Sequence, residues 1–203
     1  MEHIQSEYPE VILASGSAAR AAILASAGIR FRQQSSMIDE EAEHRQIASG
    51  TPPSDVARYL ARLKADDVLA REPGAIVIGG DQVLAIGHEI LQKPSSQEEA
   101  REQLRKLRGR THELHTAAVV VSKSHAASFV DIATLKVRDF SEKFLDCYLE
   151  MSGEGVLNSV GAYHIEGLGI HLFSEIRGDY FTILGLPILP VLEELRSRSI
   201  VCR

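Results

Sequence analysis

The segment that most constrains the fold runs from Ala75 to Leu84, where Gly79-Gly80-Asp81 interrupts an apolar run. Ala75 to Ile78 has the composition of a short buried strand, and Val83 to Ile86 resumes that pattern. The two glycines carry no Cβ, so another group can approach the backbone closely at this point. A carboxylate between two apolar strand segments is costly to bury unless a positive group or a metal meets it. The segment therefore predicts a buried sheet that ends at the glycines, with Asp81 paired to a cation.

The residues after this segment indicate a hairpin. Gly87-His88 is typical of a turn, and Lys93 returns about ten residues after Asp81, so the hairpin could bring its ammonium near the carboxylate. A carboxylate that activates water or holds a divalent metal, with an ammonium beside it, is suited to attack on a phosphate. A hairpin with a polar tip and no catalytic role is the alternative, and this segment alone does not decide between the two.

A second candidate site lies near the start of the chain. Val11 to Ala14 predicts a strand, Ser15 to Ser17 a turn, and Ala18 to Ala27 a helix that ends before Gly28. Such a turn aims backbone N–H groups and a helix N-terminus at an anion, and Arg20 adds a cation whose geometry matches phosphate. The spacing fits neither a P-loop nor a dinucleotide-binding glycine motif. A plain connection between strand and helix is the alternative.

Two polar features lie between these segments. Asp39 to Glu41 is expected to be an acidic surface loop, with metal ligation as the less favoured interpretation. The residues after Thr51 predict a helix that is capped by Ser54 and continues to about Arg71. Lys64 lies next to the apolar face of this helix. Its ammonium is expected either in solvent or in a cleft, with solvent favoured from this position alone.

The rest of the chain alternates helices and strands without an internal repeat or a linker. The sequence therefore predicts one domain over residues 1–203. The expected elements are a helix from the capping box at Ser96–Glu99 to Gly109, strands at Thr111–Val121 and Ala127–Val137, a helix after Ser141, a glycine-rich segment at Gly161–Gly169 and a helix at Pro187–Arg196.

Charge and cysteine content exclude several classes of protein. The net charge of −6 argues against a general binder of nucleic acid polymers or anionic membranes. The two cysteines, Cys147 and Cys202, form neither a disulfide framework nor a C-x-x-C zinc site, which suits a reducing cytoplasm. The first residues lack the pattern of a signal peptide, and no apolar run is long enough to span a bilayer. A cytoplasmic location is therefore expected.

Several short motifs occur in an order that resembles the Maf family of nucleoside triphosphate pyrophosphatases. Each motif alone is weak, but their joint order from Leu13 to Pro187 is specific. The matching segments are Leu13-Ala-Ser-Gly-Ser17 with Arg20, Ile38-Asp-Glu40, Leu63-Lys-Ala65, Gly80-Asp-Gln-Val83, Lys93-Pro94, Leu107-Arg-Gly-Arg-Thr-His112, Gly161-Ala-Tyr163 with Glu166-Gly167, and Ile183-Leu-Gly-Leu-Pro187.

The resemblance implies an α/β fold in which a mixed twisted sheet with flanking helices forms two lobes around a substrate cleft, usually in a homodimer. It implies hydrolysis of a nucleoside triphosphate between the α and β phosphates, with Mg²⁺ or Mn²⁺ as cofactor. Asp81 falls on the catalytic acid of the family and is the predicted catalytic residue. The positions that line the substrate cleft are Ser15, Arg20, Glu40, Lys64 and Lys93.

In the mechanism that this resemblance suggests, Asp81 orients or deprotonates the attacking water and helps to hold the metal, with Glu40 as a second ligand. Arg20, Lys64 and Lys93 neutralise the triphosphate. The alternative is a Maf-like nucleotide-binding regulator of cell division with weak or no catalysis. An unrelated α/β binding protein is a more distant alternative.

The chain departs from the usual family pattern at positions that bear on substrate choice. Ala18 and Ala19 stand where a proline and an arginine are common, and Ser159 stands where a lysine is usual. Gln82 and Glu166 replace a frequent threonine and glutamine, a combination that resembles the branch preferring 7-methyl-GTP over dTTP and UTP. Both residues are therefore predicted to bind substrate.

Overall fold

The computed structural model describes residues 4–6 and 9–202. Its strands are β1 (Val11–Leu13), β2 (Arg32–Gln33), β3 (Ile76–Ile86), β4 (Glu89–Leu91), β5 (Thr111–Ser122), β6 (His125–Val137) and β7 (Phe173–Arg177). Its helices are α1 (Ala18–Ser26), α2 (Glu40–Gln46), α3 (Pro53–Arg71), α4 (Gln97–Leu107), α5 (Glu142–Ser152), α6 (Tyr180–Ile183) and α7 (Ile188–Ser197), with two 3₁₀ turns at Gly153–Asn158 and Leu168–Leu172. None of the helices in this described part is long and apolar enough to cross a membrane.

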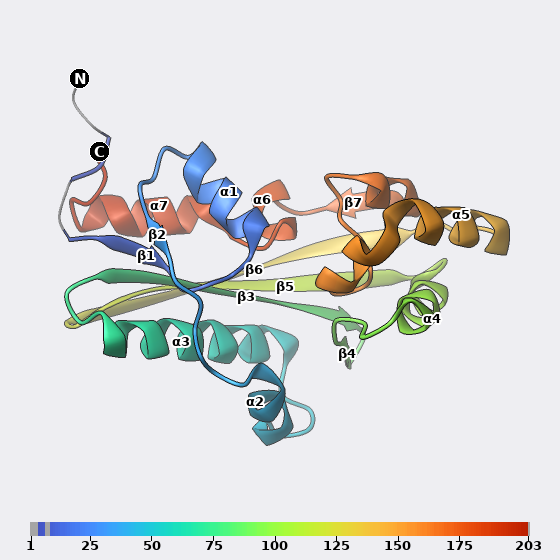
Figure 1. The fold of residues 1–203 in the computed structure, drawn as a ribbon, viewed down its shortest axis with the longest axis horizontal. Helices are drawn as coiled ribbons and strands as arrows, with labels where there is room; N and C mark the ends of the chain where they lie inside the picture. The colour runs from blue at the N-terminus through green and yellow to red at the C-terminus, as the bar shows by residue number, and fades with distance from the viewer. Residues whose placement is uncertain (1–3, 7–8, 203) are drawn as a thin grey trace. The chain divides into compact units, whose positions relative to one another are not determined.

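The described strands form one mixed sheet, as the sequence predicted. Their hydrogen-bonded order is β2-β1-β3-β5-β6-β7, and β4 pairs with β3 outside this path. The pairs of β1 with β2 and with β3 are parallel, whereas β3–β4 and β6–β7 are antiparallel. Helices flank this sheet, so the predicted mixed α/β architecture is confirmed (Figure 1).

The chain divides into two compact units, which are described here separately. Unit 1 comprises Met1–Gln82, Thr116–Asp131 and Tyr180–Arg203, and unit 2 comprises Val83–His115 and Ile132–Asp179. Strands β3, β5 and β6 contribute residues to both units. The single domain over residues 1–203 and the cleft between its lobes stay predictions.

Unit 1 is built in three layers. Helices α1 and α7 cover one face of its strands and α3 covers the other (Figure 1). Because side chains alternate along a strand, Val11 and Leu13 of β1 join the core under α1 and α7, and Ile12 between them points to the opposite face. The core under α1 and α7 also contains Ile23, Leu24, Ile76, Ile78, Val191 and Leu195.

Helix α3 lies directly on strand β3 at Gly79. A Cβ at this position would lie 2.3 Å from the backbone oxygen of Ala61 and 2.8 Å from Cβ of Ala65, so only glycine allows this approach. The predicted close approach is confirmed. The predicted break in the strand is wrong, because β3 continues from Ile76 through both glycines and Asp81 to Ile86.

The ends of the first three helices show where local sequence signals succeed and where they fail. Ser17 caps α1 by accepting a hydrogen bond from the backbone N–H of Arg20 at 3.3 Å, as the predicted turn requires. Helix α3 begins at Pro53, so the predicted cap at Ser54 is wrong; a proline in the first turn has no N–H that needs a partner. The expected acidic loop is helix α2, capped by Asp39.

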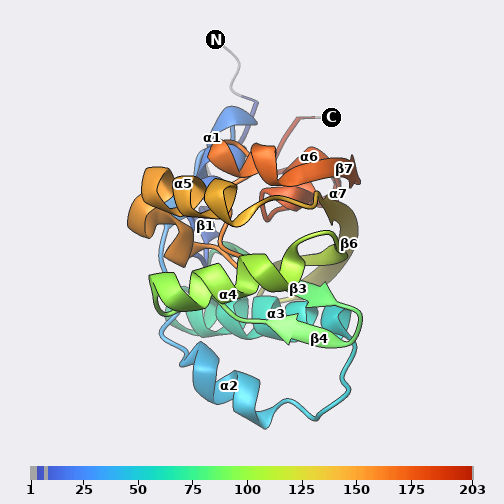
Figure 2. The same ribbon diagram turned by 90° about the vertical axis from the view of Figure 1, so that its right-hand side faces the viewer.

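Unit 2 contains the predicted hairpin, in which Leu84 of β3 pairs with Leu91 of β4. Helices α4 and α5 lie beside each other (Figure 2). Ser141 caps α5 as predicted. Ser96 caps α4, but the predicted capping box is half formed, because the Glu99 carboxylate accepts hydrogen bonds from Ser95 instead of from Ser96.

Candidate active site

A buried ion pair joins Asp81 of β3 to Lys64 of α3. Nζ of Lys64 lies 2.6 Å from Oδ1 of Asp81, and the two side chains are only 8% and 9% exposed. The contact of α3 with Gly79 places Lys64 here, since Ala61 and Ala65 on the same helix touch that glycine. The ammonium is the positive group that a carboxylate in this strand requires.

The ammonium of Lys64 also binds a second carboxylate. Oε2 of Glu40 lies 2.7 Å from Nζ, and the Glu40 side chain remains 50% exposed. Glu40 is the first residue of α2, so the helix that the sequence analysis missed supplies one member of this group. Its start could have been recognised from Asp39 as an N-cap followed by acidic residues in the first turn.

Arg20 lies beside this group and is held by two hydrogen bonds. Its Nε donates to the carbonyl oxygen of Gly185 at 2.7 Å, and its Nη1 donates to Oγ of Ser15 at 3.0 Å. Burial lowers the pKa of the Arg20 guanidinium, and the nearby carboxylates of Asp81 and Glu40 oppose this shift. The structure thus brings together five of the predicted site residues, Ser15, Arg20, Glu40, Lys64 and Asp81, within unit 1.

Gln82 lies next to Asp81, but its amide nitrogen faces the protein. Nε2 donates to Oγ1 of Thr116 at 2.8 Å and to the carbonyl oxygens of Thr182 and Ile183 at 3.0 and 3.1 Å. The sequence analysis did not single out Thr116 or Thr182, because a lone threonine in a strand or a short helix carries no motif. The Gln82 amide nitrogen therefore supports the backbone here, and its role in substrate binding stays a prediction.

Lys93 and Glu166 belong to unit 2. Both are exposed: Lys93 follows β4, and Glu166 lies in the turn after Tyr163. Oε1 of Glu166 is 3.9 Å from Nδ1 of His164. The predicted roles of Lys93 at the phosphates and of Glu166 at the base stay predictions.

The residues present suit a magnesium or manganese ion whose coordination shell is completed by substrate and water. Within residues 4–6 and 9–202, no group of three or more His, Cys, Asp or Glu side chains is arranged to hold a metal by itself. However, the carboxylates of Asp81 and Glu40 converge on a single cationic group, the ammonium of Lys64. Mg²⁺ is commonly held by one or two carboxylates together with substrate phosphates and water, so two converging carboxylates fit this requirement.

Comparison with known proteins gives one consistent result. Residues 10–198 match the family model described as Maf-like protein, a span that includes every element from β1 to α7. A 7-methyl-GTP pyrophosphatase from Brucella abortus is 46% identical over 194 residues, which cover 95% of this chain and 98% of the relative. A nucleoside triphosphate pyrophosphatase from Paramagnetospirillum magneticum is 48% identical over 190 residues, covering 93% and 98% of the two chains.

Proposed function

Since the chain belongs to the Maf-like family, we propose that it is a nucleoside triphosphate pyrophosphatase. It hydrolyses its substrate between the α and β phosphates and releases a nucleoside monophosphate and pyrophosphate. The observation that carries this function is the Lys64 ammonium buried between the carboxylates of Asp81 and Glu40. Burying these charges costs desolvation free energy, so an ion pair of this kind contributes little net stability to the fold. A role in the reaction is therefore the better explanation for its presence in the proposed function.

Asp81 is the residue that activates the attacking water. Lys64 binds its Oδ1 and so fixes the orientation of the carboxylate. The second oxygen, Oδ2, is the atom that orients the water and takes its proton. Phosphoanhydride hydrolysis depends mainly on an aligned nucleophile and on neutralised charge, so one oriented base with cations beside it is sufficient equipment.

The cationic residues neutralise the triphosphate. The guanidinium of Arg20 offers a planar set of N–H donors that matches phosphate oxygens, and Lys64 offers a compact charge. Lys93 of unit 2 is the third cation in this role. Ser15 keeps Arg20 in place through the hydrogen bond to Nη1 and completes the phosphate-binding turn.

Asp81 and Glu40 are the residues that would hold Mg²⁺ or Mn²⁺. When bound, such an ion supplies positive charge that shields the phosphate oxygens and polarises the phosphoryl group. Hard oxygen ligands favour these ions over zinc.

Glu166 selects the base. A carboxylate accepts the N1–H and amino hydrogens that guanine presents on one edge, and it favours the positive charge that 7-methylation adds. A uracil or thymine edge presents one N–H between two carbonyl groups, which repel a carboxylate. Glu166 lies in the turn between His164 and Gly169, where a Cβ at Gly169 would lie 2.4 Å from the backbone oxygen of His164. We expect 7-methyl-GTP to be a better substrate than dTTP or UTP.

Release of pyrophosphate from a panel of nucleotides tests this function. The purified protein should convert 7-methyl-GTP faster than dTTP and UTP, need added Mg²⁺ or Mn²⁺, and lose activity with EDTA. Glu166→Gln should shift the preference towards the pyrimidine nucleotides. Orthophosphate as the first product would contradict the cleavage position.

The same panel separates the enzyme from a nucleotide-binding regulator. A regulator would bind nucleotides but release no pyrophosphate above the level of the Asp81→Asn variant. We also propose that the protein acts as a homodimer in the cytoplasm. Light scattering of the purified chain tests the dimer, and a monomer at micromolar concentration would contradict it.

A further inference from the structure

Arg20 depends on a turn that is distant in the sequence. Its Nε–H donates to the carbonyl oxygen of Gly185, which follows helix α6. Gly185 has a φ of +105°, a backbone conformation that residues with a side chain rarely adopt. The direction of this carbonyl group therefore depends on how the turn from Thr182 to Gly185 is held.

The turn is held by hydrogen bonds to one atom, the carbonyl oxygen of Thr182. Three donors meet there: Nε2 of Gln82 at 3.0 Å, Oγ1 of Thr116 at 2.9 Å, and the backbone N–H of Gly185 at 3.0 Å. Gln82 belongs to β3 and Thr116 to β5, so two neighbouring strands hold the turn. The third bond closes the turn and defines where Gly185 lies.

The side chain of Thr182 supplies a second anchor. Its hydroxyl group donates to Oδ2 of Asp131 in β6 at 2.7 Å. Thr116 and Thr182 are both 0% exposed. Because solvent does not reach them, these hydroxyl groups are not placed to contact a substrate directly.

The guanidinium of Arg20 fits between two glycines. A Cβ at Gly80 would lie 3.1 Å from Nε of Arg20, and one at Gly185 would lie 3.5 Å from the same atom. The bonds to Gly185 and Ser15 use two of the five N–H groups. The other three N–H groups, on Nη1 and Nη2, are the donors that phosphate oxygens would bind in the proposed function.

We propose that Thr182, Thr116 and Asp131 are positioning residues for the reaction. They set the direction of the Gly185 carbonyl group, and that carbonyl group orients the Arg20 guanidinium toward the triphosphate. This inference rests on the proposed role of Arg20 at the phosphates. It gives a function to the segment Ile183-Leu-Gly-Leu-Pro187, which is one of the stretches that match the family pattern and which the proposed mechanism does not otherwise use.

Substitutions at Thr182 test the inference through their coupling to Arg20. Thr182→Val keeps the shape but removes the hydroxyl group, and it should lower kcat/KM about tenfold or more, mainly through kcat. Thr182→Ser keeps the hydroxyl group and should retain kcat/KM within about twofold. In an Arg20→Ala background, Thr182→Val should cost less than about twofold, because the group that it positions is absent.

Two further variants control for a general effect of losing a threonine hydroxyl group and for loss of folding. Thr134→Val makes the same chemical change at a half-buried position of β6 in unit 2, outside the segments that match the family, and its kcat/KM should equal that of the wild type. Thr116→Val removes the other buried hydroxyl group and replaces Thr182→Val if that variant does not fold, as judged by circular dichroism. It should show the same coupling to Arg20.

A measurement without substrate separates this inference from the proposed function. The Nε–H signal of Arg20 in an NMR spectrum, assigned by its loss in Arg20→Ala, should exchange with solvent about tenfold faster or more in Thr182→Val. Unchanged exchange, or an equal kcat/KM loss in both backgrounds, would overturn the positioning role. If Arg20→Ala leaves kcat/KM unchanged while the exchange rate rises as expected, then the role of Arg20 at the phosphates fails and the positioning of its side chain stands.

Discussion

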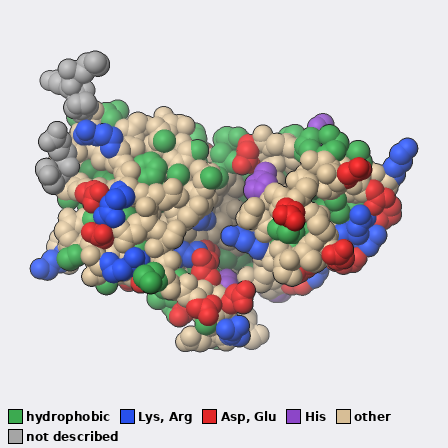
Figure 3. Space-filling model, viewed as in Figure 1, with side chains coloured by type: hydrophobic (Ala, Val, Ile, Leu, Met, Phe, Trp, Pro, Cys, Tyr) green, Lys and Arg blue, Asp and Glu red, His purple; other side chains and the backbone are tan. Residues whose placement is uncertain are grey.

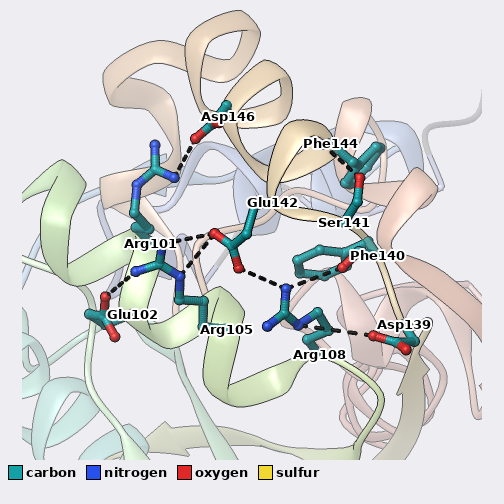
Figure 4. A network of polar contacts seen from close by, with 10 residues as sticks. All are labelled: Arg101, Glu102, Arg105, Arg108, Asp139, Phe140, Ser141, Glu142, Phe144 and Asp146. Carbon is teal, nitrogen blue, oxygen red and sulfur yellow. Dashed lines mark hydrogen bonds and ion pairs between the residues drawn. The ribbon is translucent and has the colours of Figure 1, made fainter.

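The two units differ in whether they bury an ion pair. Unit 1 buries a lysine and an aspartate against each other, with side chains 8% and 9% exposed. Unit 2 joins α4 to α5 through arginine–carboxylate pairs on its surface (Figure 4). Acidic and basic side chains are interspersed over the surface around these two helices (Figure 3).

Glu142 is the centre of the surface network in unit 2. Its carboxylate lies 2.8 Å from Nη2 of Arg105 and 2.8 Å from Nη1 of Arg108. The hydrogen bond from Arg105, which is the larger cause, and the one from Arg108 lower the pKa of the Glu142 carboxyl group. Unit 2 also buries a histidine against a phenol, in the 2.8 Å hydrogen bond between Nε2 of His112 and the hydroxyl group of Tyr163.

The difference is in line with the proposed chemical role of the buried pair. Exposed ion pairs cost little to form and stabilise little, so they can accumulate wherever two helices meet. A buried pair pays a desolvation cost that packing alone would avoid. The pair in unit 1 is therefore best explained by the reaction, and the network in unit 2 by the docking of α4 on α5.

Replacing the carboxylate of the buried pair should give the largest effect. Asp81→Asn keeps the shape of the side chain but removes the base, so kcat should fall by about 10²- to 10⁴-fold. Circular dichroism and nucleotide binding should stay close to the wild type. Turnover near the wild-type rate would remove Asp81 from the mechanism and with it the contrast between the units.

Replacing the lysine of the buried pair tests whether the pair is desolvated. Lys64→Met leaves the carboxylate of Asp81 buried without its ammonium and should lower the free energy of unfolding by about 3–5 kcal/mol. The double variant Lys64→Met/Asp81→Asn should recover most of that loss, because no uncompensated charge remains. Urea denaturation measures the stability of both variants and the wild type; a Lys64→Met protein as stable as the wild type would show that the pair is not desolvated.

The buried neutral pair in unit 2 predicts a dependence of stability on pH. Burial lowers the pKa of His112 from 6.5 to about 4, so between these values the unfolded chain binds a proton that the folded chain does not. The free energy of unfolding should therefore fall as the pH drops through this range, by about 3 kcal/mol in total.

His112→Gln removes this titration and isolates it from that of other groups. The difference in the free energy of unfolding between variant and wild type should be constant above pH 7 and should shift towards the variant below about pH 6. A difference that is independent of pH would show that His112 can be protonated in the folded protein without cost.

The surface network should give the smallest effect. Glu142→Gln removes the charge that joins Arg105 and Arg108, and the loss of stability should be small and should shrink in high salt. A thermal melt with and without 0.5 M salt, about three times the physiological ionic strength, measures it. A loss as large as that of Lys64→Met would mean that the surface and buried pairs do not differ in the way described.

The elements that were predicted well have local signals. Ser17, Ser96 and Ser141 each cap the helix that follows them, and Gly28 ends α1 with a φ of +74°. Apolar strands that border a turn or a helix cap, such as β1, were also predictable. The signal in each case lies within a few residues of the structure that it specifies.

The parts that were missed depend on distant contacts. The local pattern offered Lys93 as one possible partner for Asp81, and its place there stays a prediction. A solvated position was favoured for Lys64 from its own position, yet Lys64 binds Asp81 in the structure. That pair follows from the packing of α3 on Gly79, which no local pattern of charges reveals. The hydrogen bonds from Thr116 and Gln82 to the carbonyl oxygen of Thr182, which hold the turn at Gly185, are likewise a tertiary arrangement.

The contact at Gly79 has a genetic consequence. The atom that a new side chain would strike, 2.3 Å away, is the backbone oxygen of Ala61. Every amino acid at position 61 carries that oxygen, so no substitution there can make room. A suppressor screen that starts from Gly79→Ala should yield revertants to glycine and none at position 61. Any suppressor that instead displaced α3 would carry Lys64 away from Asp81, so it would restore folding at the expense of turnover.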